Sequence, residues 1–211
     1  MYLSSYRLGN KPDELLKLLG SKKRTALIVN AIDSLEPQER KIRLLEEVER
    51  LKSIGLEPVE IDLRNYFGKT DELKAELLQF DLIWVRGGNV FILRRAFKQS
   101  GADTFFAKML QTEQVVYGGY SAGICILQPH LRGIELVDQP DVIPNGYQAE
   151  VLWDCLGLLP YCVAPHYKSD HPESADIDKT VDYFVDNHIP FIALKDGQAI
   201  LIDGSKQVVL N

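Results

Sequence analysis

Short apolar runs alternate with amphipathic stretches along most of this chain, and this alternation limits the possible folds more than any other feature of the sequence. Apolar runs, several rich in β-branched residues, predict strands at Thr25–Asn30, Pro58–Leu63, Asp81–Arg86 and Val115–Gly118. Apolar residues at helical spacing predict helices at Pro37–Gly55, Asp71–Gln79, Val90–Lys98 and Ala122–Leu127. Strands and helices in this order predict an α/β fold of three layers, a mostly parallel sheet with helices on both faces.

The last quarter of the chain has a different pattern. Four short strand-like runs are followed or separated by the turn-forming pairs Asp196-Gly197 and Asp203-Gly204. These runs are Pro160–Val163, Phe191–Leu194, Ala199–Ile202 and Gln207–Leu210. We interpret them as further strands of the same sheet, ending in a C-terminal hairpin. The sequence contains no repeat, low-complexity segment or obvious linker, so we expect one domain, residues 1–211.

Charge and composition exclude several classes of partner. The 24 basic and 30 acidic side chains give a net charge of −6, which argues against nucleic acid or an anionic membrane surface as a partner. We find no signal peptide and no apolar run near the ~20 residues that span a bilayer. The three cysteines form no C-x-x-C pair and are too few for a disulfide framework, which indicates a reducing compartment. These features predict a soluble, cytoplasmic protein, either a monomer or a homodimer.

The segment Glu36–Lys52 is rich in charges of both signs at three- and four-residue spacing. This pattern is typical of the solvated face of a helix, where neighbouring turns form ion pairs. We therefore predict no functional role for this segment.

The strongest local signal for chemistry is the pentapeptide Gly119-Tyr120-Ser121-Ala122-Gly123, a G-x-S-x-G motif. It follows one predicted strand and precedes a predicted helix, which is the context of a nucleophile elbow. Small flanking residues allow a tight turn that holds the serine in an unfavourable backbone conformation. The alternative is a glycine-lined turn in which the serine only caps the helix. The frame of strand, turn and helix favours Ser121 as a nucleophile.

A serine nucleophile needs a base, and the chain contains four histidines. His166 ends an apolar strand and opens a polar loop, so it is expected at the edge of the sheet where parallel strands end and active sites form. His171 lies in the same loop and is the nearest competitor. His130 is expected on the far side of the helix after the elbow, and His188 at a loop or helix end.

The third member of a triad is a carboxylate that orients the base. Asp196 follows a predicted strand, and Asp170 lies in the loop of His166. The chain order of the α/β-hydrolases would instead place the acid between the serine and the histidine, at Asp138, Asp141 or Asp154. The residues alone leave this choice open.

An oxyanion hole needs a second donor besides the backbone N–H of Ala122, which follows the nucleophile. Gly87-Gly88-Asn89 comes at the end of a neighbouring predicted strand and supplies flexible backbone there, although a double glycine often only forms a turn. No G-x-G-x-x-G or G-x-x-x-x-G-K-[ST] motif is present. We therefore expect no cofactor and no metal centre.

Taken together, these motifs resemble the S51 serine peptidases, a family that includes aspartyl dipeptidase (dipeptidase E) and cyanophycinase. The resemblance covers most of the chain and rests on five elements in this order: Leu3-Ser4-Ser5, Gly87-Gly88-Asn89, Gly119–Gly123, Pro165-His166-Tyr167 and Leu194-Lys195-Asp196-Gly197. It implies a fold related to the class I glutamine amidotransferases. Those enzymes carry a cysteine at the elbow, whereas this chain has Ser121. Cys125, one helical turn further on, is interpreted as a small buried apolar residue, so glutaminase chemistry is disfavoured.

The resemblance also implies roles for individual residues. Ser121 matches the nucleophile, His166 the base, and Asp196 the position at which the dipeptidase has a glutamate. The backbone N–H groups of Gly88 and Ala122 match the oxyanion donors. The resemblance thus favours Asp196 over the other aspartates.

Two departures from the family concern the substrate. Aspartyl dipeptidases carry an arginine after the histidine that pairs with the substrate's aspartyl carboxylate, but Lys168–Asp178 contains none. Lys168 can replace it only as a point charge, without a bidentate fork, and aspartyl specificity is not predicted. Arg86 stands where many relatives have a small residue. It either binds a substrate carboxylate or forms a structural ion pair, and we favour the ion pair. Asn89 is a further candidate for substrate binding.

These observations predict a serine peptidase that hydrolyses small peptides. Two alternatives remain: an esterase or other acyl hydrolase acting on non-peptide substrates, and a protein of the same fold that binds a ligand without turnover.

Overall fold

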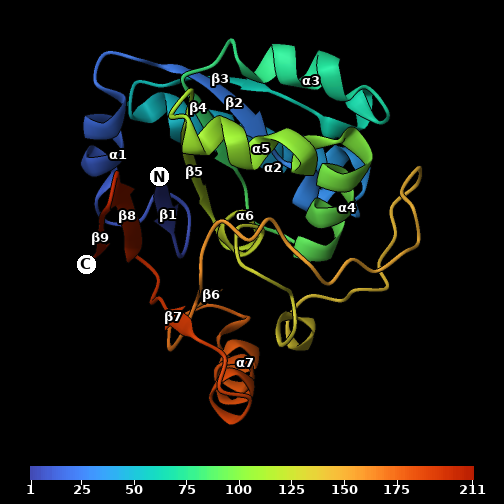
Figure 1. Cartoon of the computed structure of the whole chain (residues 1–211), viewed down its shortest axis with the longest axis vertical. Helices are drawn as coiled ribbons and strands as arrows, with labels where there is room; N and C mark the ends of the chain where they lie inside the picture. Colours follow the sequence, from blue (N-terminus) through green and yellow to red (C-terminus); the bar gives the residue numbers. More distant parts are fainter.

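A seven-stranded sheet with the order β3-β2-β4-β5-β1-β8-β9 forms the centre of the computed structural model, which describes residues 1–211 (Figure 1). The first five strands in this order run parallel, and β8 and β9 continue the sheet as an antiparallel hairpin. Its strands are β1 (Tyr2–Ser4), β2 (Arg24–Ile28), β3 (Glu57–Glu60), β4 (Leu82–Val85), β5 (Val116–Tyr120), β8 (Ala199–Asp203) and β9 (Lys206–Leu210). The predicted mostly parallel sheet and C-terminal hairpin are confirmed.

Helices cover both faces of this sheet. They are α1 (Pro12–Leu19), α2 (Pro37–Ser53), α3 (Thr70–Leu77), α4 (Val90–Ser100), α5 (Ala102–Gln111) and α6 (Ala122–Cys125). The seventh helix, α7 (Ser174–Asp186), lies away from this sheet and packs beside β6 (Cys162–Ala164) (Figure 1). Short 3-10 helices span Asn30–Ile32, Leu63–Tyr66 and Ile134–Leu136. The sequence analysis located four of the seven helices and did not locate α1, α5 or α7.

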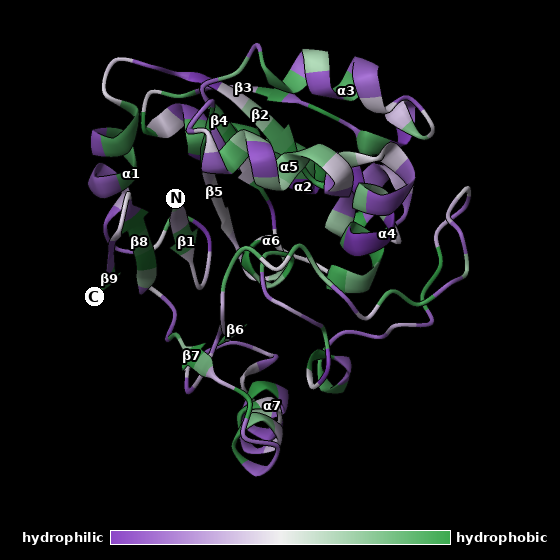
Figure 2. Ribbon diagram, in the orientation of Figure 1, coloured by the Kyte–Doolittle hydropathy of each residue, from purple (hydrophilic) through white to green (hydrophobic).

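Alternate residues of the strands enter two separate apolar cores, as expected for strands buried on both faces. Ile83 and Val85 of β4 belong to a core of 40 buried residues that also includes side chains of α3, α4, α5 and α6. Leu82 and Trp84 belong to a second core of 12 buried residues, with Leu15 of α1. Figure 2 shows the apolar residues concentrated in the strands and on the inner sides of these helices. The sheet therefore separates two layers of helices.

One predicted pairing was wrong. β6 (Cys162–Ala164) and β7 (Phe191–Ala193) pair with each other as a separate two-stranded parallel sheet, joined through α7, and are not strands of the main sheet. They cannot pair with β1, because β5 lies on one side of β1 and β8 on the other. Apolar composition predicts a buried strand but does not specify its partner.

Glycines fit the elbow closely against β4. A Cβ atom on Gly123 would lie 2.1 Å from the carbonyl oxygen of Val85, and one on Gly118 would lie 2.6 Å from the ring of Trp84. Real side chains do not approach this closely, so these two positions require glycine. The close approach brings the turn after β5 beside the end of β4.

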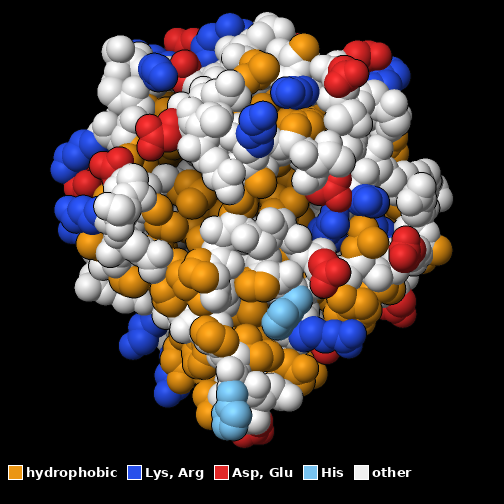
Figure 3. Space-filling model, viewed as in Figure 1, with side chains coloured by type: hydrophobic (Ala, Val, Ile, Leu, Met, Phe, Trp, Pro, Cys, Tyr) orange, Lys and Arg blue, Asp and Glu red, His pale blue; other side chains and the backbone are white.

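The surface mixes charges of both signs. Figure 3 shows basic and acidic side chains interspersed on one face, with apolar side chains gathered toward its middle. No helix of the chain is both long and apolar enough to cross a bilayer.

Candidate active site

Ser121 follows β5 directly, in a strained backbone conformation. Its φ of +52° lies in the left-handed region that side chains with a Cβ atom rarely adopt, and its ψ is −120°. The residue stands at the start of the short helix α6, so the strand, the tight turn and the helix occur in the order that the motif predicts. Such strain is found where the surrounding structure holds a functional side chain in place.

The ends of three neighbouring parallel strands meet at this point. β4 leads into Arg86-Gly87-Gly88, β5 into Ser121, and β1 into Ser5 and Tyr6. A cavity of about 360 Å³ opens there, and its lining includes Ser121, Gly88 and His166. Ligand sites of parallel sheets lie beyond the carboxyl ends of the strands, and this cavity has that position.

His166 lies just beyond the end of β6 and is 1% exposed. Its Nδ1 lies 2.7 Å from Oδ1 of Asp196. Its backbone N–H donates to Oγ of Ser5 at 2.8 Å, and that hydroxyl donates to Oδ1 of Asp196 at 2.9 Å. Ser5 therefore connects the backbone of the histidine to the carboxylate that contacts its ring.

The small second sheet explains why these two residues meet. β6 and β7 are parallel and in register, so the chain leaves both strands at the same end. The pairing continues past the strands, since the N–H of Leu194 donates to the carbonyl of Ala164 and the N–H of Tyr167 to the carbonyl of Leu194. His166 and Asp196 follow within two residues of these bonds.

Asp196 is held in its ionised form. Burial raises its pKa, but the hydrogen bond and charge of His166 and the hydrogen bond from Ser5 lower it more, so that its pKa falls below the usual value. The carboxylate is therefore available as an acceptor for the Nδ1–H of His166 at neutral pH.

The other candidate acids lie elsewhere. Asp170, Asp141 and Asp154 are exposed, and none of them contacts His166. Asp138 is half-buried and accepts a hydrogen bond from the backbone N–H of Val90 at 2.8 Å, at the start of α4. Burial of the carboxyl group raises its pKa to about 7, although the hydrogen bond from Val90 lowers it. Only Asp196 contacts the imidazole of His166 among these aspartates.

The remaining histidines occupy distinct positions. The ring of His171 stacks on that of His166, with centroids 3.7 Å apart and planes at 9°. Burial, together with the charge of His166, lowers the pKa of His171. His130 forms an isolated β-bridge with Asp154, and His188 is exposed just after α7. Neither histidine lines the cavity.

Two backbone N–H groups border Ser121. Gly88 lines the cavity with a φ of +142°, and its N–H donates to no backbone or side-chain acceptor in the chain. A Cβ atom there would lie 2.5 Å from the carbonyl oxygen of Ala31, so the position requires glycine. Ala122 is the first residue of α6, where the N–H has no acceptor within the helix.

The structure separates the three candidates for substrate binding. Arg86 lines the cavity, and no carboxylate lies within 4.0 Å of it, which contradicts the ion-pair interpretation. Its Nη1 donates to the carbonyl of Gly87 at 2.7 Å, while its Nε is buried without a partner. Asn89 does not line the cavity: its side chain caps α4 by accepting from Phe91 and Ile92 and donates to the carbonyl of Gln139.

Lys168 also lies away from the cavity. Its side chain is exposed, and Nζ lies 5.1 Å from the centre of the Tyr167 ring. The loop bends it outward at a φ of +47°. The proposed substitute for the family's arginine is therefore not positioned to contact a substrate beside Ser121.

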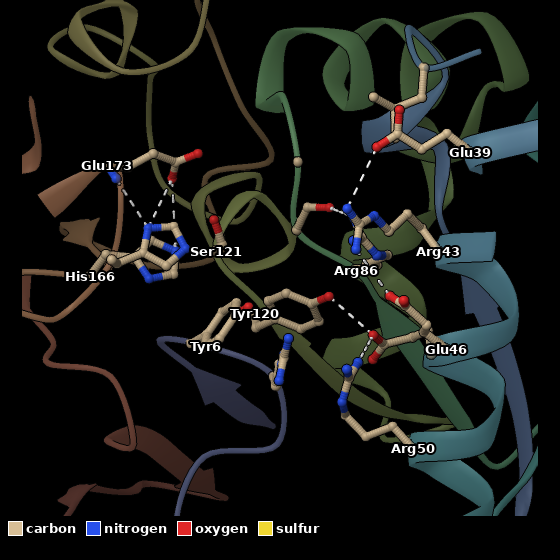
Figure 4. Close-up of a pocket in the computed structure, with 16 residues that line it drawn as sticks. Tyr6, Glu39, Arg43, Glu46, Arg50, Arg86, Tyr120, Ser121, His166 and Glu173 are labelled. Carbon is tan, nitrogen blue, oxygen red and sulfur yellow. Dashed lines mark hydrogen bonds and ion pairs between the residues drawn. The ribbon is translucent and has the colours of Figure 1, made fainter. Parts of the chain in front are cut away.

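The interpretation of Glu36–Lys52 as a solvated helix face needs correction. Five charged side chains of α2 line the cavity: Glu39, Arg43, Glu46, Glu47 and Arg50 (Figure 4). Glu47 is fully buried, because it accepts from Nε1 of Trp84 at 2.9 Å and from the hydroxyl of Tyr120 at 3.1 Å and pairs with Arg50. Not all apolar residues of α2 face the core, since Ile42 and Leu45 are about half exposed.

Three further residues of the site had no predicted role. Ser5, which hydrogen-bonds both His166 and Asp196, was noted only as part of a family motif. Tyr6 packs edge-on against the rings of His166 and His171, and Glu173 places Oε2 4.0 Å from Nε2 of His166. No pattern in the sequence identifies them, because their contacts join segments that lie far apart along the chain. Cys125 is buried as expected, and burial raises its pKa well above the usual value.

Comparison with known proteins finds relatives across most of the chain. The profile of peptidase family S51 matches residues 7–210. Among curated proteins, the chain is 34% identical over 121 residues to an uncharacterized peptidase of Listeria innocua and 29% identical over 154 residues to peptidase E of Streptomyces coelicolor. These matches cover 56% and 71% of this chain, but only 54% and 59% of the two relatives, little more than half of their length.

Solved structures share the fold. A candidate peptidase E protein from Listeria monocytogenes EGD-e superposes with a TM-score of 0.79 at 24% identity, covering 99% of this chain and 96% of that one. A peptidase from an acI-B1 Actinobacterium superposes with a TM-score of 0.68 at 15% identity, covering 99% and 86%. At these identities the similarity shows the fold alone.

Proposed function

Because this chain belongs to peptidase family S51, we propose that it is a serine peptidase that hydrolyses peptide bonds in small peptides, with Ser121, His166 and Asp196 as its catalytic residues. The family membership confirms the resemblance deduced from the motifs. The observation that carries the proposed triad is the contact of 2.7 Å between Nδ1 of His166 and Oδ1 of Asp196, at a cavity that His166 shares with Ser121.

The proposed reaction uses this geometry directly. Asp196 accepts the Nδ1–H of His166, which leaves the lone pair of Nε2 free to take the hydroxyl proton of Ser121. Oγ of Ser121 then attacks the scissile carbonyl, and the resulting oxyanion accepts hydrogen bonds from the N–H groups of Gly88 and Ala122. His166 returns its proton to the leaving amine as the C–N bond breaks. A water, deprotonated by His166, hydrolyses the acyl-enzyme and releases Ser121.

The cavity indicates the size and charge of the substrate. A volume of about 360 Å³ is at the lower end of small-molecule sites, which favours a short peptide. Figure 4 shows Ser121 between His166 on one side and Arg86 on the other. Arg43 is paired with Glu39 and Glu46, and Arg50 with Glu47, whereas the guanidinium of Arg86 has no acidic partner. We assign Arg86 to a carboxylate of the peptide.

A panel of substrates tests the proposed activity. Purified protein is incubated with a dipeptide library, longer peptides blocked at both ends, and short acyl esters, and the products are quantified by mass spectrometry. We expect turnover of unblocked dipeptides and much slower turnover of the blocked peptides. Hydrolysis of esters alone would identify an esterase, and no turnover of any substrate would indicate a ligand-binding protein.

The role of Arg86 gives a separate prediction. Arg86→Met keeps the length of the side chain but removes the charge, and charge-assisted hydrogen bonds contribute roughly 1.5–3 kcal/mol. We expect KM for dipeptides to rise by about 10–100-fold with a smaller change in kcat, measured by steady-state kinetics. Arg43→Met is the matched control, because Arg43 lines the same cavity but is already paired with acids. An equal rise of KM in both variants would contradict a specific role for Arg86.

A further inference from the structure

One wall of the cavity brings together three side chains that are common metal ligands. They are His166, His171 and Glu173, and one nitrogen or oxygen atom from each lies within 4.8 Å of the other two. Oε2 of Glu173 lies 4.0 Å from Nε2 of His166 and 3.9 Å from Nδ1 of His171. All three residues line the cavity that contains Ser121 (Figure 4).

The hydrogen bonds of His166 favour metal binding at this wall. Asp196 engages Nδ1, so Nε2 is the nitrogen that is left to bind a metal or a proton. A carboxylate on the far nitrogen of a histidine ligand is the usual outer shell of a zinc site, where it fixes the tautomer and makes the ligand more basic. Ser5 and Tyr6 hold the ring further, through the backbone N–H and by edge-on packing.

The other two ligands can move to complete a site. Glu173 forms no ion pair with lysine or arginine, and its side chain is 43% exposed. Zinc bonds of about 2.0–2.2 Å in a tetrahedral site place ligand atoms roughly 3.4 Å apart, so Glu173 has to approach each nitrogen by roughly half an ångström. The stacked ring of His171 has to rotate so that its lone pair points between the rings. Metal binding then replaces the 3.3 Å hydrogen bond that Nδ1 of His171 accepts from the backbone N–H of Glu173.

We propose that His166, His171 and Glu173 bind Zn²⁺ or a similar borderline-soft divalent cation, with the fourth position open to the cavity. Two imidazoles and one carboxylate are a donor set that zinc prefers and magnesium does not. The bound cation occupies the lone pair of Nε2 that the proposed mechanism needs for the proton of Ser121. The site is therefore inhibitory: metal binding stops peptide hydrolysis until a chelator removes the metal. The inhibition rests on the proposed function, but the binding does not.

Zinc binding is measured directly, by competition between the protein and a chromophoric chelator for ZnCl₂. We expect one zinc per chain, and an affinity at least about tenfold lower in His171→Ala and in Glu173→Gln. His188→Ala is the matched control, because His188 is exposed at the end of α7 and should leave the affinity unchanged. MgCl₂ should not compete. Melting curves without metal check that each variant folds, and His171→Asn replaces His171→Ala if that variant does not.

The same measurement on Ser121→Ala separates the two proposals, since this variant keeps all three ligands. Zinc binding by Ser121→Ala, with no peptide hydrolysis by the wild type, would support the metal site and contradict the proposed function. Peptide hydrolysis that stays insensitive to ZnCl₂ would leave the proposed function intact and overturn the metal site. Wild-type affinity in both His171→Ala and Glu173→Gln would also overturn it.

Discussion

Replacement of Ser121 by alanine is expected to lower kcat for dipeptide hydrolysis by about 10⁶-fold, the order of loss seen when a serine protease loses its nucleophile. The hydroxyl oxygen of Ser121 forms the bond to the substrate in the proposed mechanism. The thiol of Cys125 is buried, and burial raises its pKa well above the usual value, so it cannot act as a substitute.

The variant should remain folded. Alanine has the same Cβ atom as serine, so Ser121→Ala keeps the strain of the left-handed φ of +52° and the melting temperature should change little. Ser121→Gly should melt at a higher temperature than Ser121→Ala, because glycine adopts positive φ without the cost of roughly 1–2 kcal/mol paid by other residues. A higher melting temperature of Ser121→Gly than of Ser121→Ala would show that the backbone is strained at this position in the folded protein.

Labelling by a fluorophosphonate probe measures the nucleophile independently of the substrate. We expect the wild type to be labelled and Ser121→Ala to remain unlabelled, with the intact masses read by mass spectrometry. Ser53→Ala, an exposed serine at the end of α2, is the matched control and should label like the wild type. Equal labelling of wild type and Ser121→Ala would assign the reactive residue elsewhere.

Local sequence was sufficient to predict the part of the site that belongs to the main sheet. Ser121 and Gly88 follow strands that are strongly apolar, and the carboxyl ends of parallel strands meet at one edge. Their proximity therefore follows from the order of strands and helices. The requirement for glycine at Gly88 and Gly123 comes from close contacts with Ala31 and Val85, which only the folded chain shows.

The contact between His166 and Asp196 could not be predicted from the residues alone. It depends on the parallel pairing of β6 with β7, whereas the sequence suggested that both strands extend the main sheet. Three-residue strands have too few side chains to specify a partner by pattern. The family resemblance selected Asp196, and the choice between five aspartates was otherwise open.

The position of α2 was misjudged for a different physical reason. Charges at three- and four-residue spacing pair within the helix whether the helix faces solvent or the rim of a cavity, as Arg43 does with Glu39 and Glu46. The distinguishing contacts are non-local: Glu47 is buried because Trp84 of β4 and Tyr120 of β5 donate hydrogen bonds to it. Sequence spacing therefore cannot tell a solvated helix face from one that borders a cavity.

Replacement of Asp196 by asparagine is expected to lower kcat by about 10⁴-fold, the loss found when the acid of a serine protease triad becomes an amide. The amide nitrogen can donate to Nδ1 of His166, which stabilises the tautomer that carries its hydrogen on Nε2. That nitrogen then has no lone pair to accept the proton of Ser121. Steady-state kinetics on the same dipeptides measure the effect, and probe labelling should slow in parallel.

Asp170→Asn is the matched control, because Asp170 belongs to the loop of His166 but is exposed and does not contact its ring. It should change kcat by less than about tenfold, since surface substitutions away from such contacts have small effects. A large loss in Asp170→Asn with a small loss in Asp196→Asn would transfer the orienting role to the loop.

The pH dependence of stability gives the Asp196 variant a readout that does not depend on turnover. Because the pKa of Asp196 is lowered in the folded protein, its carboxylate stabilises the fold above the unfolded pKa of about 3.9. That stabilisation is lost as the pH falls through the lower, folded pKa. Asp196→Asn lacks it at every pH, so its melting temperature should lie below that of the wild type at pH 7 and converge with it in acid. A constant difference down to the lowest pH would mean that the loss comes from packing, and that the charge of Asp196 does not hold His166 in place.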